Sequence, residues 1–87
     1  MQNVILAVSE VRPADRDTKA FRFVLRCLCK DNYSELVVHT QNMCDESFHN
    51  GYYTRSLEKA LDNLKDRAKK QNLLILELTN ENTKDNY

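Results

Sequence analysis

The chain of 87 residues has one glycine, one proline and no tryptophan. Glycine and proline are the residues that most often interrupt regular elements, so most of this chain can form strands and helices. The single glycine, Gly51, leaves no glycine-rich loop that could hold a phosphate group, and no HExxH zinc motif occurs. The sequence therefore predicts a protein that is not an enzyme and that carries no cofactor.

Neither sign of charge is in excess, because thirteen basic side chains balance thirteen acidic ones. Non-specific affinity for nucleic acid depends largely on neutralising phosphates, so this balance argues against a protein that coats DNA. No apolar run approaches the roughly 18 residues of a membrane span, and the run Val4–Val8 is too short for a signal peptide. We therefore expect a cytoplasmic protein without a membrane segment.

Cysteine occurs three times, as Cys27, Cys29 and Cys44. An odd number does not form a closed set of disulfides, which indicates free thiols in a reducing compartment. Together with His49 these residues are zinc-ligand types, but Cys27 and Cys29 lack the C-x₂₋₄-C spacing of zinc knuckles. Both also fall among phenylalanine and leucine on the apolar face of a predicted strand. The prediction is core thiols and no metal site.

The length predicts one domain, which we place at residues 1–79, followed by a flexible polar tail at 80–87. A chain this short buries only about 60% of the surface that its unfolded form exposes, so its stability is marginal. Association with a second copy is one common remedy. A homodimer is therefore one hypothesis for this chain.

One helix is predicted from residue 57 onwards by apolar residues at helical spacing. Those residues are Leu57, Ala60, Leu61, Leu64 and Ala68. Ser56 is a suitable N-cap, and Asn72 is a suitable left-handed stop. Two continuous apolar runs, 4–8 and 73–76, are typical of strands that are covered on both faces. These two runs are predicted to be adjacent strands of one sheet.

Residues 19–41 alternate between apolar and polar side chains, which predicts two half-buried strands joined at Asp31-Asn32. A two-residue turn there makes the numbers of cross-strand partners add up to 63, so that Leu25 faces Val38. The apolar face of this hairpin is predicted to contain Phe21, Phe23, Leu25, Cys27, Leu36 and Val38. The opposite face is predicted to contain Arg22, Val24, Arg26, Leu28, Tyr33, Glu35, Val37 and His39.

These elements predict an α+β fold with the order β-β-β-α-β. Its four-stranded, mostly antiparallel sheet would have the strand order 3-2-1-4, with one helix packed on the face that contains Phe21, Phe23 and Leu25. The last strand, which follows the helix, is expected to lie parallel to the first. Residues 42–55 are predicted to form a long loop, and long loops on a rigid scaffold often carry function.

The element order and the helix start Ser56-Leu57-Glu58-Lys59-Ala60-Leu61 resemble the truncated ribonuclease-H-like domain of HicB-type antitoxins over residues 36–78. The segment before the helix differs, because this chain has Asn42-Met43-Cys44-Asp45-Glu46 where that family has a segment containing Pro-Gly. The resemblance is one of fold, and it implies no function.

No second helix is available to cover the hairpin face that carries Arg22 and Arg26. Apolar side chains rimmed by arginine are typical of protein interfaces, and an edge strand can also accept a strand from a partner. Together with the aromatic residues of the long loop, this face predicts a small protein-binding regulator or inhibitor that binds a partner or a second copy. The predicted partner-binding residues are Arg22, Val24, Arg26, Tyr33, Val37, His39, Phe48, Tyr52 and Tyr53.

Two other functions are open at this stage. One is a nucleic-acid-binding module that uses cations and an aromatic ring on the same sheet face. Its residues would be Arg22, Arg26, Lys30, Tyr33 and Arg55. The other is a thiol enzyme with Cys44 as nucleophile and His49 as base, although the sequence indicates no substrate cleft beside them.

Overall fold

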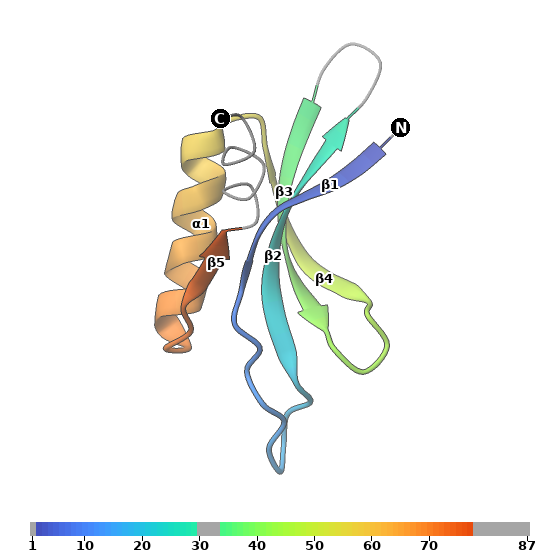
Figure 1. The fold of residues 1–87 in the computed structure, drawn as a ribbon, viewed down its shortest axis with the longest axis vertical. Helices are drawn as coiled ribbons and strands as arrows, with labels where there is room; N and C mark the ends of the chain where they lie inside the picture. Colours follow the sequence, from blue (N-terminus) through green and yellow to red (C-terminus); the bar gives the residue numbers. More distant parts are fainter. Residues whose placement is uncertain (1, 30–33, 78–87) are drawn as a thin grey trace, which may run out of the picture.

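A computed structural model describes residues 2–29 and 34–77 of the chain, and it contains five strands and one helix in this part. In chain order the elements are β1 (Gln2–Ser9), β2 (Phe21–Cys29), β3 (Ser34–Asn42), β4 (Phe48–Thr54), α1 (Leu57–Lys70) and β5 (Ile75–Glu77), as Figure 1 shows. The strands form one sheet with the order β4-β3-β2-β1-β5, in which all neighbours are antiparallel.

An α+β fold with an antiparallel sheet and one helix was predicted, and this is confirmed. The predicted four strands and the order 3-2-1-4 are wrong, because half of the expected loop 42–55 forms strand β4 beside β3. The turn between β3 and β4 is formed by hydrogen bonds between residues that are two positions apart. The Asn42 side chain accepts the Cys44 N–H at 2.8 Å, and the Asp45 side chain accepts the Ser47 N–H at 3.0 Å. Such side-chain turns reverse the chain without glycine or proline.

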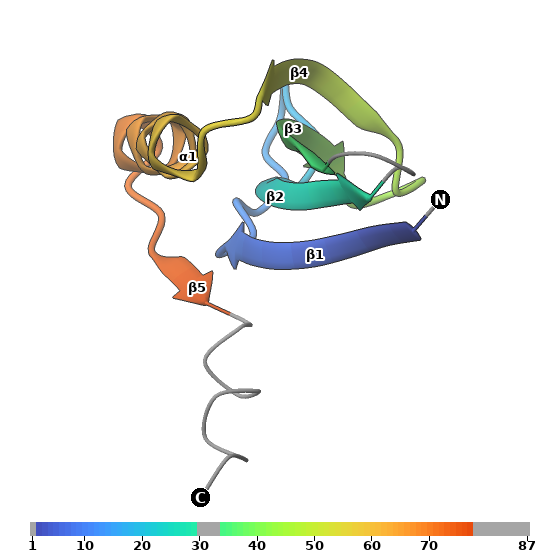
Figure 2. The ribbon, with the colours of Figure 1, turned by 90° about the horizontal axis from the view of Figure 1, so that it is seen from above.

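The first and last strands are neighbours, as predicted, but β5 runs antiparallel to β1 rather than parallel. The unexpected strand β4 is the reason, because it reverses the chain direction once more before the helix. The pairing is short: β5 meets β1 only through Ala7, Val8 and Ser9. Much of β1 therefore extends beyond β5 (Figure 2).

The predicted register of the central hairpin is confirmed. Leu25 pairs with Val38 and Cys27 with Leu36, and the whole β2–β3 ladder keeps the partner sum of 63. The turn residues Asp31-Asn32 lie outside the described residues. The apolar face also agrees with the prediction, since its six side chains all belong to the core or pack against it.

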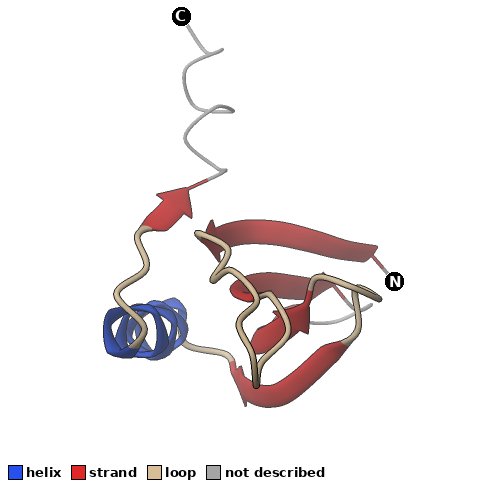
Figure 3. Ribbon diagram, turned by 90° about the horizontal axis from the view of Figure 1, so that it is seen from below, coloured by secondary structure: helices blue, strands red, loops and turns tan. Residues whose placement is uncertain are grey.

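Helix α1 lies on that apolar face, at one side of the sheet (Figures 1 and 3). Its buried side chains are Ala60, Leu64 and Ala68, and all three are at most 1% exposed. They share one apolar cluster with residues of the central hairpin that include Leu25 and Val38, both fully buried. Apolar burial of this kind is the main source of stability in a domain this small.

Both helix ends have the predicted caps. The Ser56 hydroxyl accepts the Lys59 N–H at 3.2 Å, which satisfies one of the free donors of the first turn. At the other end Asn72 has a φ of 58°, and its N–H donates to the Lys69 carbonyl while the Leu73 N–H donates to Ala68. This pair of bonds is a Schellman motif, which ends the helix and turns the chain towards β5.

The face of the sheet turned away from α1, here called the outer face, is concave. The β3–β4 ladder is irregular between Val38 and Thr40, and β4 bends towards the outer face (Figures 2 and 3). Val24 and Val37 are fully buried there, and His39 is 7% exposed. The prediction that these three side chains lie exposed on a bare sheet face is wrong, because bulges bend strands and the bent β4 covers them.

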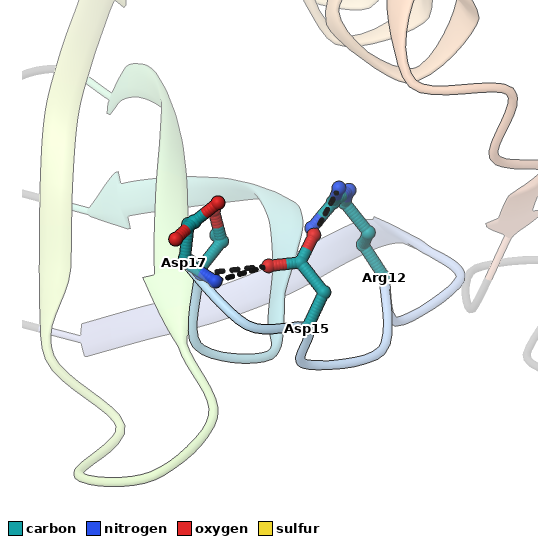
Figure 4. A network of polar contacts seen from close by, with 4 residues as sticks. Arg12, Asp15 and Asp17 are labelled. Carbon is teal, nitrogen blue, oxygen red and sulfur yellow. Dashed lines mark hydrogen bonds and ion pairs between the residues drawn. The ribbon is translucent and has the colours of Figure 1, made fainter.

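The connection between β1 and β2 is held by one carboxylate (Figure 4). Asp15 accepts the N–H groups of Asp17 and Thr18 and the guanidinium of Arg12. The Asp17 N–H contributes most to holding the pKa of Asp15 below its ordinary value, followed by the Arg12 side chain. Arg12 in turn lies 5.6 Å from the centre of the Phe21 ring. The turn therefore fixes where β2 begins.

The predicted tail at residues 80–87 lies outside the described residues, and so do the last two residues of the predicted domain 1–79. Within residues 2–29 and 34–77, no helix is long and apolar enough to cross a membrane.

Candidate functional site

Four side chains from β2, β3 and β4 meet on the outer face. These residues, Arg26, His39, Phe48 and Tyr53, are here called the aromatic–cation cluster. The Arg26 guanidinium carbon lies 4.0 Å from the centre of the Phe48 ring, and its Nη2 is 3.3 Å from His39 Nδ1. The centre of the His39 ring is 5.3 Å from that of Phe48 and 5.8 Å from that of Tyr53. Val24 pairs with His39, and Val37 pairs with Arg26 and Tyr53, so the cluster lies beside these two buried valines on the same face and serves as their lid.

The pKa of His39 lies below its ordinary value. Burial lowers its pKa most, and the positive charges of Arg26, Arg67 and His49 lower it further. A guanidinium can only donate, so His39 Nδ1 accepts from Arg26 and the ring is neutral with its proton on Nε2. His39 is thus a packed ring that resists protonation, not an exposed histidine.

A pH-dependent stability follows from the lowered pKa of His39. The unfolded chain takes up a proton near the ordinary histidine pKa of about 6.5, whereas the folded chain does so only at lower pH. We therefore expect the free energy of unfolding to fall as the pH drops below that value, by at most about 1.4 kcal/mol per pH unit for this group. Urea unfolding between about pH 7.5 and about pH 5.5 measures this.

The control for that measurement is His39→Gln, which keeps a polar side chain but removes the titration. The free energy of unfolding of this variant should depend less on pH than that of the unaltered chain over the same range. His49 is present in both proteins, so the difference between them reports His39 alone. Equal slopes for the two proteins would show that His39 protonates equally well in the folded and unfolded chains.

The structure brings together only part of the predicted partner-binding set. Arg26, His39, Phe48 and Tyr53 form the aromatic–cation cluster, although two of them were expected in a sheet and two in a loop. Tyr52 lies on the opposite face and packs against the core. The remaining members are Arg22, whose Nε donates to Gln41 Oε1 at 2.8 Å, the buried Val24 and Val37, and Tyr33, which lies outside the described residues. Their role in binding stays a prediction.

Exposed apolar side chains concentrate at the opposite edge of the sheet. Seven large apolar or aromatic residues are exposed in the described part of the chain, and five of them lie in or beside β1 and β5. These five, here called the β1–β5 edge patch, are Val4 (43%), Ile5 (38%), Val11 (43%), Leu74 (68%) and Leu76 (48%). Grouped exposure of this kind marks interaction surfaces, whereas single exposed apolar residues are ordinary.

The β1–β5 edge patch was not predicted from the sequence, although the two apolar segments that contain most of it were. The runs 4–8 and 73–76 were predicted to be covered on both faces, and that prediction is wrong for Val4, Ile5, Leu74 and Leu76. A strand that is apolar on both faces fits either complete burial or an interface. Periodicity alone does not distinguish the two.

The main-chain pairing at this edge is short in the described part of the chain. Because β5 pairs only with Ala7–Ser9, the half of β1 at Gln2–Leu6 has no strand on that side among the described residues. The other edge of the sheet is protected. There the Arg67 guanidinium donates to the carbonyl of Asn50 at 2.7 Å, at the irregular part of β4. Bulges and covering side chains are the usual means of blocking strand addition.

The alternative of a thiol enzyme gains no support from the geometry. Cys44 is exposed, and His49 Nε2 contacts the Ser47 hydroxyl at 2.8 Å. That hydroxyl donates to Asp45 at 2.7 Å, which holds the pKa of Asp45 below its ordinary value. The serine proton is thus directed to a carboxylate rather than to the imidazole, unlike in a hydrolase. No three His, Cys, Asp or Glu residues in the described part of the chain are grouped to hold a metal ion.

A hollow of about 340 Å³ lies between the β1–β2 connection and the adjoining ends of β3 and β4. It is lined by residues 17–21 and by Thr40, Asn42, His49 and Asn50. The lining comes from the ends of strands and from the segments that join them.

Comparison of the chain with models of protein families, with curated proteins and with solved structures gives no match. The fifth strand also separates the fold from the four-stranded arrangement that the resemblance to HicB-type antitoxins implied.

Proposed function

We propose that this chain is a small, non-enzymatic regulator or inhibitor that acts by binding a protein through the β1–β5 edge patch. The observation that carries the proposal is the concentration of five of seven exposed large apolar side chains at one edge of the sheet. Removing such side chains from water stabilises a complex by about 25 cal/mol per Å² of apolar surface. A protein that acts by occupying a partner needs a surface of this kind and no reactive group.

The patch continues into the aromatic–cation cluster. Across the sheet Ile5 pairs with Arg26, Arg26 with Val37, and Val37 with Tyr53. Side chains in one such row lie on the same face, so Ile5 stands in line with Arg26 and the exposed Tyr53. Tyrosine and arginine are enriched in protein interfaces. The row thus joins the apolar edge at Ile5 to an arginine and a tyrosine, two residue types that are common in protein interfaces.

The alternative function, nucleic-acid binding, is less well supported. Arg22 is engaged by Gln41, and Arg26 lies against Phe48 and His39, so both guanidinium groups already have protein partners. Phe48 is covered by Arg26 on the side where a base would stack. Titration with single-stranded RNA and DNA at low and high salt separates the two functions, since nucleic-acid affinity falls steeply with salt.

Replacing Ile5 and Leu76 together by aspartate is expected to abolish partner capture. Both side chains are exposed, so the substitutions should leave folding intact while they place charges in the apolar contact. The measurement is affinity capture from the native host followed by mass spectrometry, with the tagged chain and the double variant in parallel.

The matched control is Leu57→Asp. Leu57 is equally apolar and 53% exposed, but it lies in the first turn of α1, where an acidic side chain is favourable. This variant should capture the same proteins as the unaltered chain. If the double variant captured them as well, the β1–β5 edge patch would not be the binding surface.

A further inference from the structure

We infer that protonation of His39 opens the outer face in mild acid: residues 48–50, here called the β4 tip, then move away from the sheet while the rest of the domain stays folded. The inference goes beyond the proposed function, because it concerns the outer face and not the β1–β5 edge patch. Three properties of the described residues carry it. They are the bonding of the His39 ring, the charges around that ring and the weak attachment of the β4 tip.

The His39 ring is enclosed in its neutral form. Its Nδ1 accepts from Arg26 Nη2 at 3.3 Å. Its Nε2 lies against Gly51, where a Cβ atom would be only 2.7 Å away, and the rings of Phe48 and Tyr53 lie beside it. A protonated imidazole carries a hydrogen on both nitrogens and accepts no hydrogen bond. Protonation therefore ends the bond from Arg26 and sets two donors against each other at that contact.

The charges that act on His39 in the described part of the chain are all positive. They come from three different elements: Arg26 on β2, Arg67 on α1, and His49 on β4 once it is protonated. On β3 itself, the neighbours of His39 on this face are uncharged; they are Val37 and Gln41. Arg26 Nε is buried and has no hydrogen-bond partner among the described residues. A proton on this buried ring therefore costs free energy as long as the ring stays in place.

The β4 tip is weakly attached to the sheet. Phe48 is half-buried, and the two residues after it are exposed. Only two residue pairs, Thr40–His49 and Gln41–Phe48, join the tip to β3 beyond the irregular step. The bond from α1 to the Asn50 carbonyl is exposed, so water can replace it. Segments with few buried apolar contacts open at a lower free energy than the domain as a whole.

The irregular step of the β3–β4 ladder supplies the hinge. It lies opposite His39, because Val38 pairs with Tyr52 and Thr40 pairs with His49. Tyr52 also packs against the core, so the half of β4 beyond the step stays in place. Gly51 lies between the two halves, and glycine changes its backbone angles more easily than other residues. The ring that takes up the proton and the point at which the strand bends are therefore at the same level of the sheet.

The opening is expected below the ordinary histidine pKa of about 6.5. Burial and the neighbouring cations lower the pKa of His39 in the closed form, and opening relieves both. Each unit by which this pKa is lower in the closed form than in the open form shifts the ratio of open to closed molecules about tenfold at low pH. The ratio therefore rises as the pH falls. His39 and His49 are the only histidines of the chain, so few other groups titrate in this range.

NMR spectroscopy of the chain with ¹³C-labelled valine methyl groups, in the presence of a soluble gadolinium chelate, tests the inference. Val24 and Val38 are both fully buried, but Val24 pairs with His39 on the outer face, whereas Val38 belongs to the cluster under α1. Lowering the pH from about 7.5 to about 5.5 should raise the paramagnetic relaxation of the Val24 methyl groups at least about threefold. The relaxation of the Val38 methyl groups should stay unchanged.

The matched variants replace the two histidines in turn. His39→Gln removes the titration from the enclosed ring, so Val24 should stay shielded at both pH values. His49→Gln changes an exposed side chain and should open as the unaltered chain does. An equal rise at Val24 in both variants would overturn the inference. So would a Val24 signal that does not change down to about pH 5.5 in the unaltered chain.

The unaltered chain alone decides the question if His39→Gln does not fold. The rise at Val24 has to follow the titration of the His39 ring signals, and a rise that follows those of His49 instead would contradict the inference. A rise at Val38 in step with Val24 would contradict it too, because the domain would then unfold as a whole. Partner capture through Ile5 and Leu76 does not depend on these outcomes, so the proposed function is tested separately.

Discussion

Leu64→Ala is expected to lower the free energy of unfolding by about 2–5 kcal/mol, the range observed when a buried leucine leaves a cavity. Leu64 is fully buried in the middle of α1 and belongs to the cluster that joins the helix to Leu25 and Val38. Only three side chains of the helix are buried, and the other two are alanines. Leu64 is therefore the one large side chain of α1 that is fully buried, and the half-buried Leu61 packs against the same cluster.

The expected loss in the free energy of unfolding is large relative to the total stability of the domain. Globular domains have about 0.05–0.15 kcal/mol of stability per residue, so this single change removes a major share for a chain of 87 residues. Urea unfolding followed by circular dichroism measures it, and Leu57→Ala is the control. Leu57 lies on the same helix but is 53% exposed, so its truncation should change stability by less than about 0.5 kcal/mol. Similar losses for both leucines would contradict the packing of α1 described above.

The features that could be predicted from the sequence depend on neighbouring residues. Ser56 and Asn72 mark the two ends of α1 because caps are made by residues within one turn of the helix end. The β2–β3 register follows from the alternation of side chains and from the length of one turn, and Leu25 opposite Val38 confirms it. In these cases the residues that decide the structure lie within a few positions of the residues they position.

The outer face could not be predicted because its burial depends on a distant bend. Val24 and Val37 were assigned to the correct face, yet they are buried because β4 bends over them. The bend lies where the β3–β4 ladder is irregular, opposite His39, and Asn50 has a φ of 56° there. An irregular step interrupts the period of two by which strands are recognised, so residues 42–55 resembled a loop.

The candidate site was missed for a related reason. Strand β1 is apolar on both faces, which is typical of a strand inside a sheet, and it does have neighbours on both sides. However, β5 is described for only three residues, so Val4 and Ile5 lie beyond its end. How far one strand extends past another depends on where the helix ends and on the path back to the sheet. No local pattern in the run Val4–Val8 contains that information.

Gly51→Ala is expected to destabilise the chain by about 1–3 kcal/mol, as overpacking of a filled site does. The backbone at Gly51 is not left-handed, so the need for glycine is one of space. A Cβ atom there would lie 2.7 Å from His39 Nε2 and 2.9 Å from Tyr53 Cε1. The His39 ring is held between Arg26 and Phe48 and is 7% exposed, so it has little freedom to move away.

A double-mutant cycle assigns this loss to the His39 contact. In a His39→Ala background the imidazole is absent, and Tyr53, which is 54% exposed, can turn towards solvent. Gly51→Ala should then cost much less than it does beside histidine, with a coupling free energy of about 0.5–3 kcal/mol. Urea unfolding of the four proteins gives this value. Additive losses would mean that the methyl group meets the backbone instead, and that the only glycine of the chain is not required by the lid over Val24 and Val37.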